Sequence, residues 1–144
     1  MSRKRNVWKK LLNNCKLNGI YQKPDGTWTI NSSTNQRRMT DQRQWKPAKI
    51  LITENDLEEQ YKKQGEVCYW FKIPLDLNLL YKDHTDWAPK HPLAPSVDRI
   101  DDTKDYTPDN ILITCRFANL GRNIYPFDKM QILIETIKDS MNKN

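Results

Sequence analysis

The chain of 144 residues has only two histidines, three cysteines and no long apolar run. Without an apolar run of about 20 residues, no membrane-spanning helix is expected. The odd number of scattered cysteines, Cys15, Cys68 and Cys115, does not form a disulfide framework and favours a reducing compartment. Residues 1–10 are charged, with no apolar signal region behind them. We therefore expect a cytoplasmic protein without a membrane partner, in the host cell cytoplasm if it is phage-encoded.

Positive charge is concentrated in the first third of the chain. Residues 1–50 hold 12 Lys and Arg against two Asp, a net charge of +10, whereas residues 51–144 hold 12 basic and 16 acidic residues, a net charge of −4. Clustered cations neutralise phosphates and release counterions, although a solvated basic surface has the same composition. Double-stranded DNA is the expected partner. The predicted DNA contacts here are Arg3, Lys4, Arg5, Lys9, Lys10, Arg37, Arg38 and Arg43.

The apolar periodicity predicts a single α+β domain over residues 1–144, with a basic region at 1–52 and a core at 53–144. The predicted helices cover residues 3–17, 54–64, 75–81, 115–123 and 127–141. The predicted strands cover a hairpin at 21–30 and residues 67–73, 96–100 and 111–114. Residues 31–48 have no period and are expected to be a loop. The last helix is expected to bury Met130, Leu133, Ile134 and Ile137.

Carboxylates, arginines and asparagines gather in residues 95–123, where a strand, a polar turn, a second strand and a helix are predicted. Asp98 ends the first strand and Asn119 lies on the helix, so that each offers an oxygen to a hard divalent cation. So few protein ligands leave room for water and phosphate oxygens, as is usual for Mg²⁺ in phosphoryl-transfer sites. Mg²⁺ or Mn²⁺ is therefore the expected cofactor.

Three further side chains suit phosphodiester hydrolysis. Arg99 offers a forked cation for a phosphate, although it could instead pair with neighbouring aspartates. Tyr106 supplies a phenol with a reference pKa near 10, which an adjacent metal and guanidinium are expected to lower; alternatively, its ring only packs. Asn110 is expected to pin the turn through hydrogen bonds to the backbone. His91 is kept as a substitute base.

The spacing of these residues resembles that of the HNH endonucleases, also called ββα-metal or His-Me finger nucleases. In that family an Asp-His pair ends the first strand, an Asn is central, and a His or Asn lies on the helix. Here Asp98-Arg99, Asn110 and Asn119 occupy these places, and the order Asp-Arg, Tyr, Asn is similar to the PacI-type variant. The resemblance covers about residues 53–140 and is strongest in 96–123.

The resemblance implies a ββα-metal nuclease core with added helices and the basic amino-terminal region. It also implies that Asp98 and Asn119 hold the metal and that Tyr106 replaces histidine as base or nucleophile. Arg116 and Arg122 are further predicted phosphate contacts. Many family members carry two CxxC pairs that bind structural zinc, whereas this chain keeps only Cys68 and Cys115 at those places. We therefore expect no structural zinc, two neighbouring reduced thiols, and apolar packing of Phe71 and Ala118.

Two functions from different classes follow. The first is a metal-dependent endonuclease that hydrolyses double-stranded DNA, either phage-type or homing, or restriction-like. It would act as a homodimer if it cuts both strands. The second is a catalytically inactive DNA-binding module on the same scaffold. The retained Tyr106 favours the enzyme, because an inactive site has no need of this combination of residues.

Overall fold

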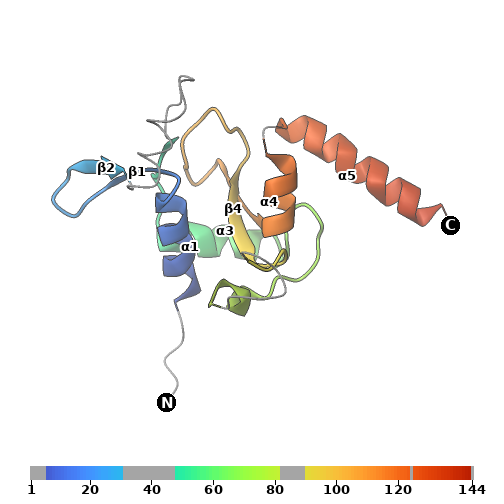
Figure 1. Cartoon of the computed structure of the whole chain (residues 1–144), viewed down its shortest axis with the longest axis horizontal. Coiled ribbons are helices and arrows are strands. Elements are labelled where there is room, and N and C mark those ends of the chain that lie inside the picture. The colour runs from blue at the N-terminus through green and yellow to red at the C-terminus, as the bar shows by residue number, and fades with distance from the viewer. Residues whose placement is uncertain (1–5, 31–47, 82–89, 124, 144) are drawn as a thin grey trace, which may run out of the picture.

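The computed structural model describes residues 6–30, 48–81, 90–123 and 125–143, which form helices and two small sheets (Figure 1). The helices are α1 (Val7–Lys16), α3 (Glu54–Lys63), α4 (Arg116–Arg122), α5 (Phe127–Asn142) and the 3₁₀ helix η1 (Leu77–Tyr81). The strands are β1 (Gly19–Gln22), β2 (Trp28–Ile30), β3 (Ala48–Lys49), β4 (Pro95–Arg99) and β5 (Ile111–Cys115). The predicted α+β class is confirmed. Within the described residues, none of the helices combines the length and apolar character needed to cross a membrane.

The first two long helices begin at side-chain caps. The Asn6 side chain accepts a hydrogen bond from the Lys9 backbone nitrogen at the start of α1. Thr53 and Asp56 form a reciprocal capping box at the start of α3. Gly65, with a φ of 77°, follows the end of α3, in the left-handed region that favours glycine. The predicted helix at 54–64 is thereby confirmed, apart from one residue at its end.

The first sheet has the strand order β2-β1-β3 and includes the predicted hairpin. Strands β1 and β2 pair antiparallel, and Asp25 and Gly26 shape the turn between them. Strand β3 pairs parallel with β1 at Gly19, where a Cβ atom would lie 2.4 Å from the Ala48 carbonyl oxygen. This close approach explains the glycine. Most of the predicted loop at 31–48 lies outside the described residues.

The second sheet pairs β4 and β5 antiparallel, with Asp98 opposite Leu112 and Arg99 opposite Ile111. Helix α4 follows β5 directly, so that the predicted order of strand, turn, strand and helix is confirmed. All five residues of β5 are buried, whereas β4 alternates buried and half-buried residues over its first four positions and contacts α1 and α4. A parallel bridge between Ile50 and Tyr106 joins the turn of this unit to the chain that follows β3.

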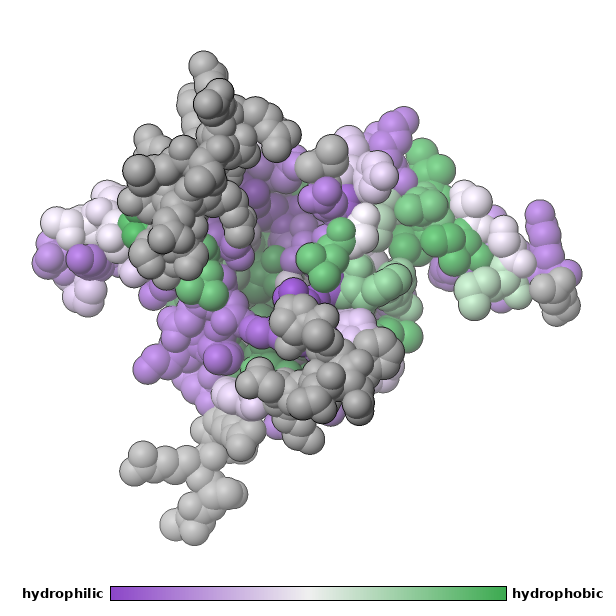
Figure 2. All heavy atoms as spheres, viewed as in Figure 1, coloured by the Kyte–Doolittle hydropathy of each residue, from purple (hydrophilic) through white to green (hydrophobic). Residues whose placement is uncertain are grey.

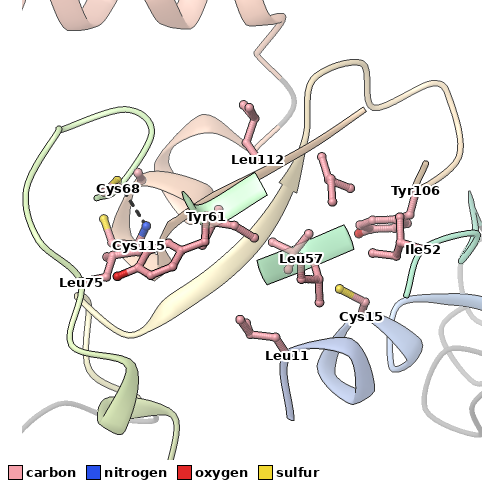
Figure 3. Packing of buried hydrophobic residues seen from close by; sticks show 14 of the residues in the cluster. Leu11, Cys15, Ile52, Leu57, Tyr61, Cys68, Leu75, Tyr106, Leu112 and Cys115 are labelled. Carbon is pink, nitrogen blue, oxygen red and sulfur yellow. Dashed lines mark hydrogen bonds between the residues drawn. The ribbon is translucent and has the colours of Figure 1, made fainter. Parts of the chain in front are cut away.

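One hydrophobic core packs α1, α3 and β5 together (Figure 3). Leu11 of α1, Leu57 of α3 and Ile113 of β5 are almost completely buried in it. Tyr106 lies beside Ile52 and Cys15 at one end of the cluster, and the pair Cys68 and Cys115 lies at the other end (Figure 3). The core therefore reaches the floor of the predicted site.

Two expectations about the helices and strands are wrong. Residues 67–73 form a turn rather than a strand, because Lys72 adopts a φ of 58° and its nitrogen donates to the Cys68 carbonyl oxygen. Helix α5 buries Met130 and half-buries Ile134, but it leaves Leu133 46% and Ile137 45% exposed. Helix α5 extends away from the body of the molecule, so that only its first turns meet the core (Figure 1).

Candidate active site

A cleft of about 620 Å³ opens between α1, β4 and α4. Its lining includes the four residues on which the sequence hypothesis depends: Asp98, Arg99, Tyr106 and Asn119. Strand β4 contributes the first two, the turn before β5 contributes the tyrosine, and α4 contributes the asparagine. Residues up to 21 positions apart in the sequence therefore share one concave surface, which is the usual location of an active site.

The Asp98 carboxylate is firmly oriented. Its Oδ2 accepts a hydrogen bond from Arg122 Nη1 at 2.7 Å and a longer one from Trp70 Nε1 at 3.4 Å. Its Oδ1 accepts only the Arg99 backbone nitrogen, at 2.9 Å, among the described residues. A carboxylate oxygen can accept two hydrogen bonds or ligands. Oδ1 therefore retains a lone pair for a group in the cleft.

The Asn119 carboxamide is held through its nitrogen. Nδ2 donates to Ser96 Oγ at 2.7 Å and to the Val97 carbonyl oxygen at 3.2 Å. Both donor positions are therefore used, and Oδ1 makes no hydrogen bond within the part of the chain that the structure describes. The free oxygen is the atom that a hard cation requires.

Arg99 and Tyr106 form a stacked pair. The guanidinium carbon lies 4.9 Å from the centroid of the tyrosine ring, and Nη1 donates to the Lys104 carbonyl oxygen at 2.7 Å. Arg99 makes no ion pair with Asp101, whose carboxylate faces Lys104 instead. The alternative in which Arg99 pairs with this aspartate is therefore not observed. Stacking leaves the remaining guanidinium donors for an anion in the cleft.

The Tyr106 hydroxyl is a weaker acid than expected. Burial, with smaller contributions from the neighbouring Cys15 and Asp98, raises the pKa of Tyr106 to about 12. Arg99 lowers the pKa, as predicted, but its effect is smaller than that of burial, because the tyrosine is only 9% exposed. The lowering expected from the guanidinium is therefore present but outweighed by burial, and the lowering expected from a bound metal stays a prediction.

Asn110 closes the turn between the two strands. Its Oδ1 accepts the Asp101 nitrogen at 2.9 Å, and its Nδ2 donates to the carbonyl oxygens of Asp101 and Asp105 at 3.0 and 2.9 Å. The predicted pinning of the turn is confirmed. These bonds help to hold the backbone of the turn on which Tyr106 lies. Asn110 is buried and is not part of the cleft lining, so it positions the site rather than contacting a substrate.

The remaining predicted site residues lie in different places. Arg116 lines the cleft, and Lys9 and Lys10 lie on α1. His91 Nδ1 accepts the Leu93 nitrogen at 3.0 Å, and His91 is not part of the described cleft lining, although Lys90 is. The predicted DNA contacts Arg3, Lys4, Arg5, Arg37, Arg38 and Arg43 lie outside the described residues.

Arg122 is not placed to contact DNA, and this prediction is corrected. The side chain is only 2% exposed, and its guanidinium carbon lies 5.6 Å from the ring centroid of Trp70 and 5.9 Å from that of Phe127. Its donors go to Asp98, to the carbonyl oxygens of residues 99 and 100, and to that of Tyr125. A buried guanidinium with these partners orients the carboxylate instead of meeting a phosphate.

The two remaining cysteines of the predicted zinc positions lie together. The Cys115 nitrogen donates to Cys68 Sγ at 3.3 Å, and neither residue has exposed surface (Figure 3). Both are free thiols. Ala118 is buried beside them, and Phe71 packs on Phe117 at 6.2 Å between centroids. The predicted adjacency and apolar packing are confirmed. The contact with the Cys115 thiol lowers the pKa of Cys68, and the same thiol contact, together with burial, raises the pKa of Cys115.

Some residues of the site were not found from the sequence. Trp70 and Ser96 contact the two predicted ligands, and Asn14 of α1 and Asn18, which follows α1, also line the cleft. Arg122 follows Asn119 by three positions on the same helix, and this spacing could have indicated a shared face. No pattern in the sequence brings α1 to β4, because that contact depends on tertiary packing.

The donor set suits a small divalent cation. Asp98 and Asn119 supply one carboxylate oxygen and one carboxamide oxygen, the kind of ligand that Mg²⁺ and Mn²⁺ prefer. The described residues contain no cluster of three or more His, Cys, Asp or Glu with metal-site geometry. Any cation here therefore completes its shell with water or with oxygens of a substrate. No family model, curated protein or solved structure matches this chain.

Proposed function

We propose that the chain is a metal-dependent endonuclease of the HNH type that hydrolyses phosphodiester bonds in double-stranded DNA. One observation carries the proposal: Asp98, Asn119, Arg99 and Tyr106 line the same cleft. Two of them present oxygens suited to a hard cation, one presents a forked cation, and one presents a phenol. The net charge of +10 on residues 1–50 supports DNA as the substrate.

Each side chain has a role in the proposed reaction. Asp98 and Asn119 would hold Mg²⁺ or Mn²⁺, which when bound neutralises charge on the scissile phosphate. Arg99 would donate to a phosphate oxygen and stabilise the charge that develops on it. Arg116, on the cleft wall, would contact a neighbouring phosphate and keep the strand in register. Asn110 fixes the turn and thereby the position of Tyr106.

The general base is Tyr106 in this proposal. The pKa of Tyr106 in the metal-free protein is raised to about 12, so the phenol is mostly protonated at neutral pH and its activity as a base should increase as the pH rises. The cleavage rate is therefore expected to keep rising between pH 7 and pH 10. A rate that levels off near neutrality is typical of a histidine base and would favour His91.

Cleavage of both strands by one site per chain would require a homodimer, whereas a monomer would nick. Lys9 and Lys10 on α1 would bind the phosphates of the duplex, together with the predicted contacts outside the described residues, Arg3, Lys4, Arg5, Arg37, Arg38 and Arg43. Phage-type or homing and restriction-like roles both suit such an enzyme.

The second candidate is a DNA-binding module that has lost its chemistry. Two observations favour it: Arg122 and Trp70 already occupy Asp98 Oδ2, and burial keeps Tyr106 protonated. We prefer the enzyme because, among the described residues, Asp98 Oδ1 accepts only one hydrogen bond and Asn119 Oδ1 accepts none.

A plasmid assay separates the two. Supercoiled plasmid is incubated with the protein and Mg²⁺ or Mn²⁺, with EDTA as the control, and Asp98→Ala and Tyr106→Phe are compared. The enzyme proposal predicts metal-dependent nicking or linearisation that both variants lose. DNA that shifts in a gel but is never cut would establish the binding module. Full activity of Tyr106→Phe together with loss in His91→Ala would move the base to His91.

A further inference from the structure

Cations outnumber anions around Asp98. Two carboxylates line the described cleft, those of Asp98 and Asp102. Three cationic side chains line it as well: Lys90, Arg99 and Arg116. A further guanidinium, that of Arg122, contacts Asp98 from behind at 2.7 Å. The described groups of the cleft therefore have a net positive charge, which attracts an anion and repels a cation.

Arg122 is a fixed part of this field. Its side chain is 2% exposed, donates to the Ile100 carbonyl oxygen at 2.6 Å and to that of Tyr125 at 3.1 Å, and lies near the rings of Trp70 and Phe127. A guanidinium remains charged under all ordinary conditions. The negative charge of Asp98 is therefore already neutralised in part by Arg122, and Asp98 attracts a cation less strongly than an unpaired carboxylate would.

From this charge balance we propose that the divalent cation binds strongly only when a DNA phosphate is present, and that Arg122 is the positioning residue that imposes this dependence. The inference rests on the proposed function, since the phosphate belongs to the bound strand. One shared carboxylate and one neutral carboxamide provide little negative charge, and a phosphate supplies the remainder. The same phosphate is attracted by Arg99 and Arg116, so that DNA and cation complete the site together.

Such coupling is reciprocal. If DNA strengthens cation binding by some factor, the cation strengthens DNA binding by the same factor. This sign is diagnostic, because an added divalent salt that acts only by screening weakens the binding of a basic protein to DNA. A gain in DNA affinity on addition of a cation therefore reports a shared site.

The test uses the wild-type full-length chain. Mn²⁺ is titrated calorimetrically into the free protein, and the anisotropy of a short fluorescent duplex is measured in EDTA and in Ca²⁺, with a gel to show that the duplex stays intact. We expect no Mn²⁺ binding by the free protein below about 1 mM and a gain in DNA affinity of about tenfold or more with Ca²⁺. Asp98→Asn should lose this gain.

Two results would overturn the inference. One is binding of a single Mn²⁺ with micromolar affinity in the absence of DNA, lost in Asp98→Asn. The other is a DNA affinity that Ca²⁺ leaves unchanged or weakens while the same protein still cuts plasmid. A protein that neither cuts plasmid nor gains DNA affinity with any cation refutes the proposed nuclease itself, so the two failures are distinguishable.

Two variants isolate the part of Arg122. Arg122→Gln removes the charge and keeps a donor, so Mn²⁺ affinity of the free protein should rise about fivefold or more and the coupling with DNA should fall. Arg122→Lys keeps the charge and should leave both quantities close to those of the wild type. A purely structural role would instead lower metal binding in both variants, in step with their melting temperatures. If Arg122→Gln does not fold, Arg122 is shown to be needed for the fold, and the wild-type titrations still decide whether cation and DNA binding are coupled.

Discussion

Helices α4 and α5 follow one another in the chain but have opposite environments. Helix α4 has only seven residues, yet Asn119 and Arg122 tie it to β4 through side-chain hydrogen bonds. Helix α5 has 16 residues and buries only Met130, while apolar side chains gather along its exposed surface (Figure 2). Helix α4 is held by specific polar contacts and carries part of the candidate site, whereas helix α5 carries none of the predicted site residues.

The difference indicates which substitutions should matter. A change at the junction of β4 and α4 affects both the fold and the cleft, because the same hydrogen bonds support both. A change on the outer face of α5 affects neither, since those side chains already meet solvent. The four predictions below test this contrast.

The largest effect is expected for Asp98→Ala. Removing the carboxylate leaves Arg122 buried without its anionic partner, which costs roughly 3–5 kcal/mol. The free energy of unfolding is measured by urea denaturation. Asp98→Asn is the matched control, because a carboxamide still accepts a hydrogen bond from the guanidinium. Equal stability of Asp98→Ala and the wild type would show that the ion pair does not hold the junction.

Within α5, Met130→Ala should destabilise the protein by roughly 2–5 kcal/mol, because the side chain is only 4% exposed in the core. Ile137→Ala, at a position 45% exposed on the same helix, should change the free energy of unfolding by less than about 0.5 kcal/mol. The melting temperatures of Met130→Ala and Ile137→Ala, each compared with that of the wild type, test both expectations. A large loss in Ile137→Ala would mean that the outer face is covered in solution.

Alkaline pH should destabilise the fold through Tyr106. Its pKa is raised from 10 to about 12, so the folded state keeps the phenolic proton longer than the unfolded chain does. The stabilisation is complete below pH 10 and is lost as the pH rises from 10 to 12, by up to about 2–3 kcal/mol. Cys15, with a pKa raised by burial from 9 to about 12, adds a larger loss of up to about 4 kcal/mol that starts near pH 9. Urea midpoints measured from pH 8 to 11 should fall, and less steeply in Tyr106→Phe.

A smaller effect is expected for Asn119→Ala. The variant loses the hydrogen bonds to Ser96 and Val97, each worth about 1 kcal/mol. The control is Leu120→Ala on the exposed face of the same helix, which should be nearly neutral. Plasmid cleavage should fall in Asn119→Ala and not in Leu120→Ala. Unchanged cleavage in Asn119→Ala would remove this residue from the proposed metal site.

The sequence predicted α4 and its surroundings better than α5. Short-range signals, such as the Thr53 cap and the polar turn before Asn110, locate elements whose contacts are local. The apolar period of α5 shows that a helix forms but not how much of it meets the core, because packing depends on the rest of the fold. The prediction of a strand at 67–73 is wrong for a related reason. Lys72 adopts a positive φ in a turn that packs against β5, and this contact depends on the tertiary fold.

The site itself was predicted in part. The spacing of Asp98, Tyr106 and Asn119 identified three side chains that line one cleft. The pairing of Arg122 with Asp98 and the raised pKa of Tyr106 depend on burial, which no residue spacing reports. For the same reason, Arg122 was wrongly predicted to contact DNA.

The central claim is that the oxygens of Asp98 and Asn119 bind one cation. It is tested most directly by the anomalous signal of Mn²⁺ in crystals of the protein bound to a DNA duplex. The account predicts one strong peak within bonding distance of both side chains and of a phosphate oxygen. A Mn²⁺ peak bound elsewhere, with Asp98 contacting only Arg122 and Trp70, would contradict it.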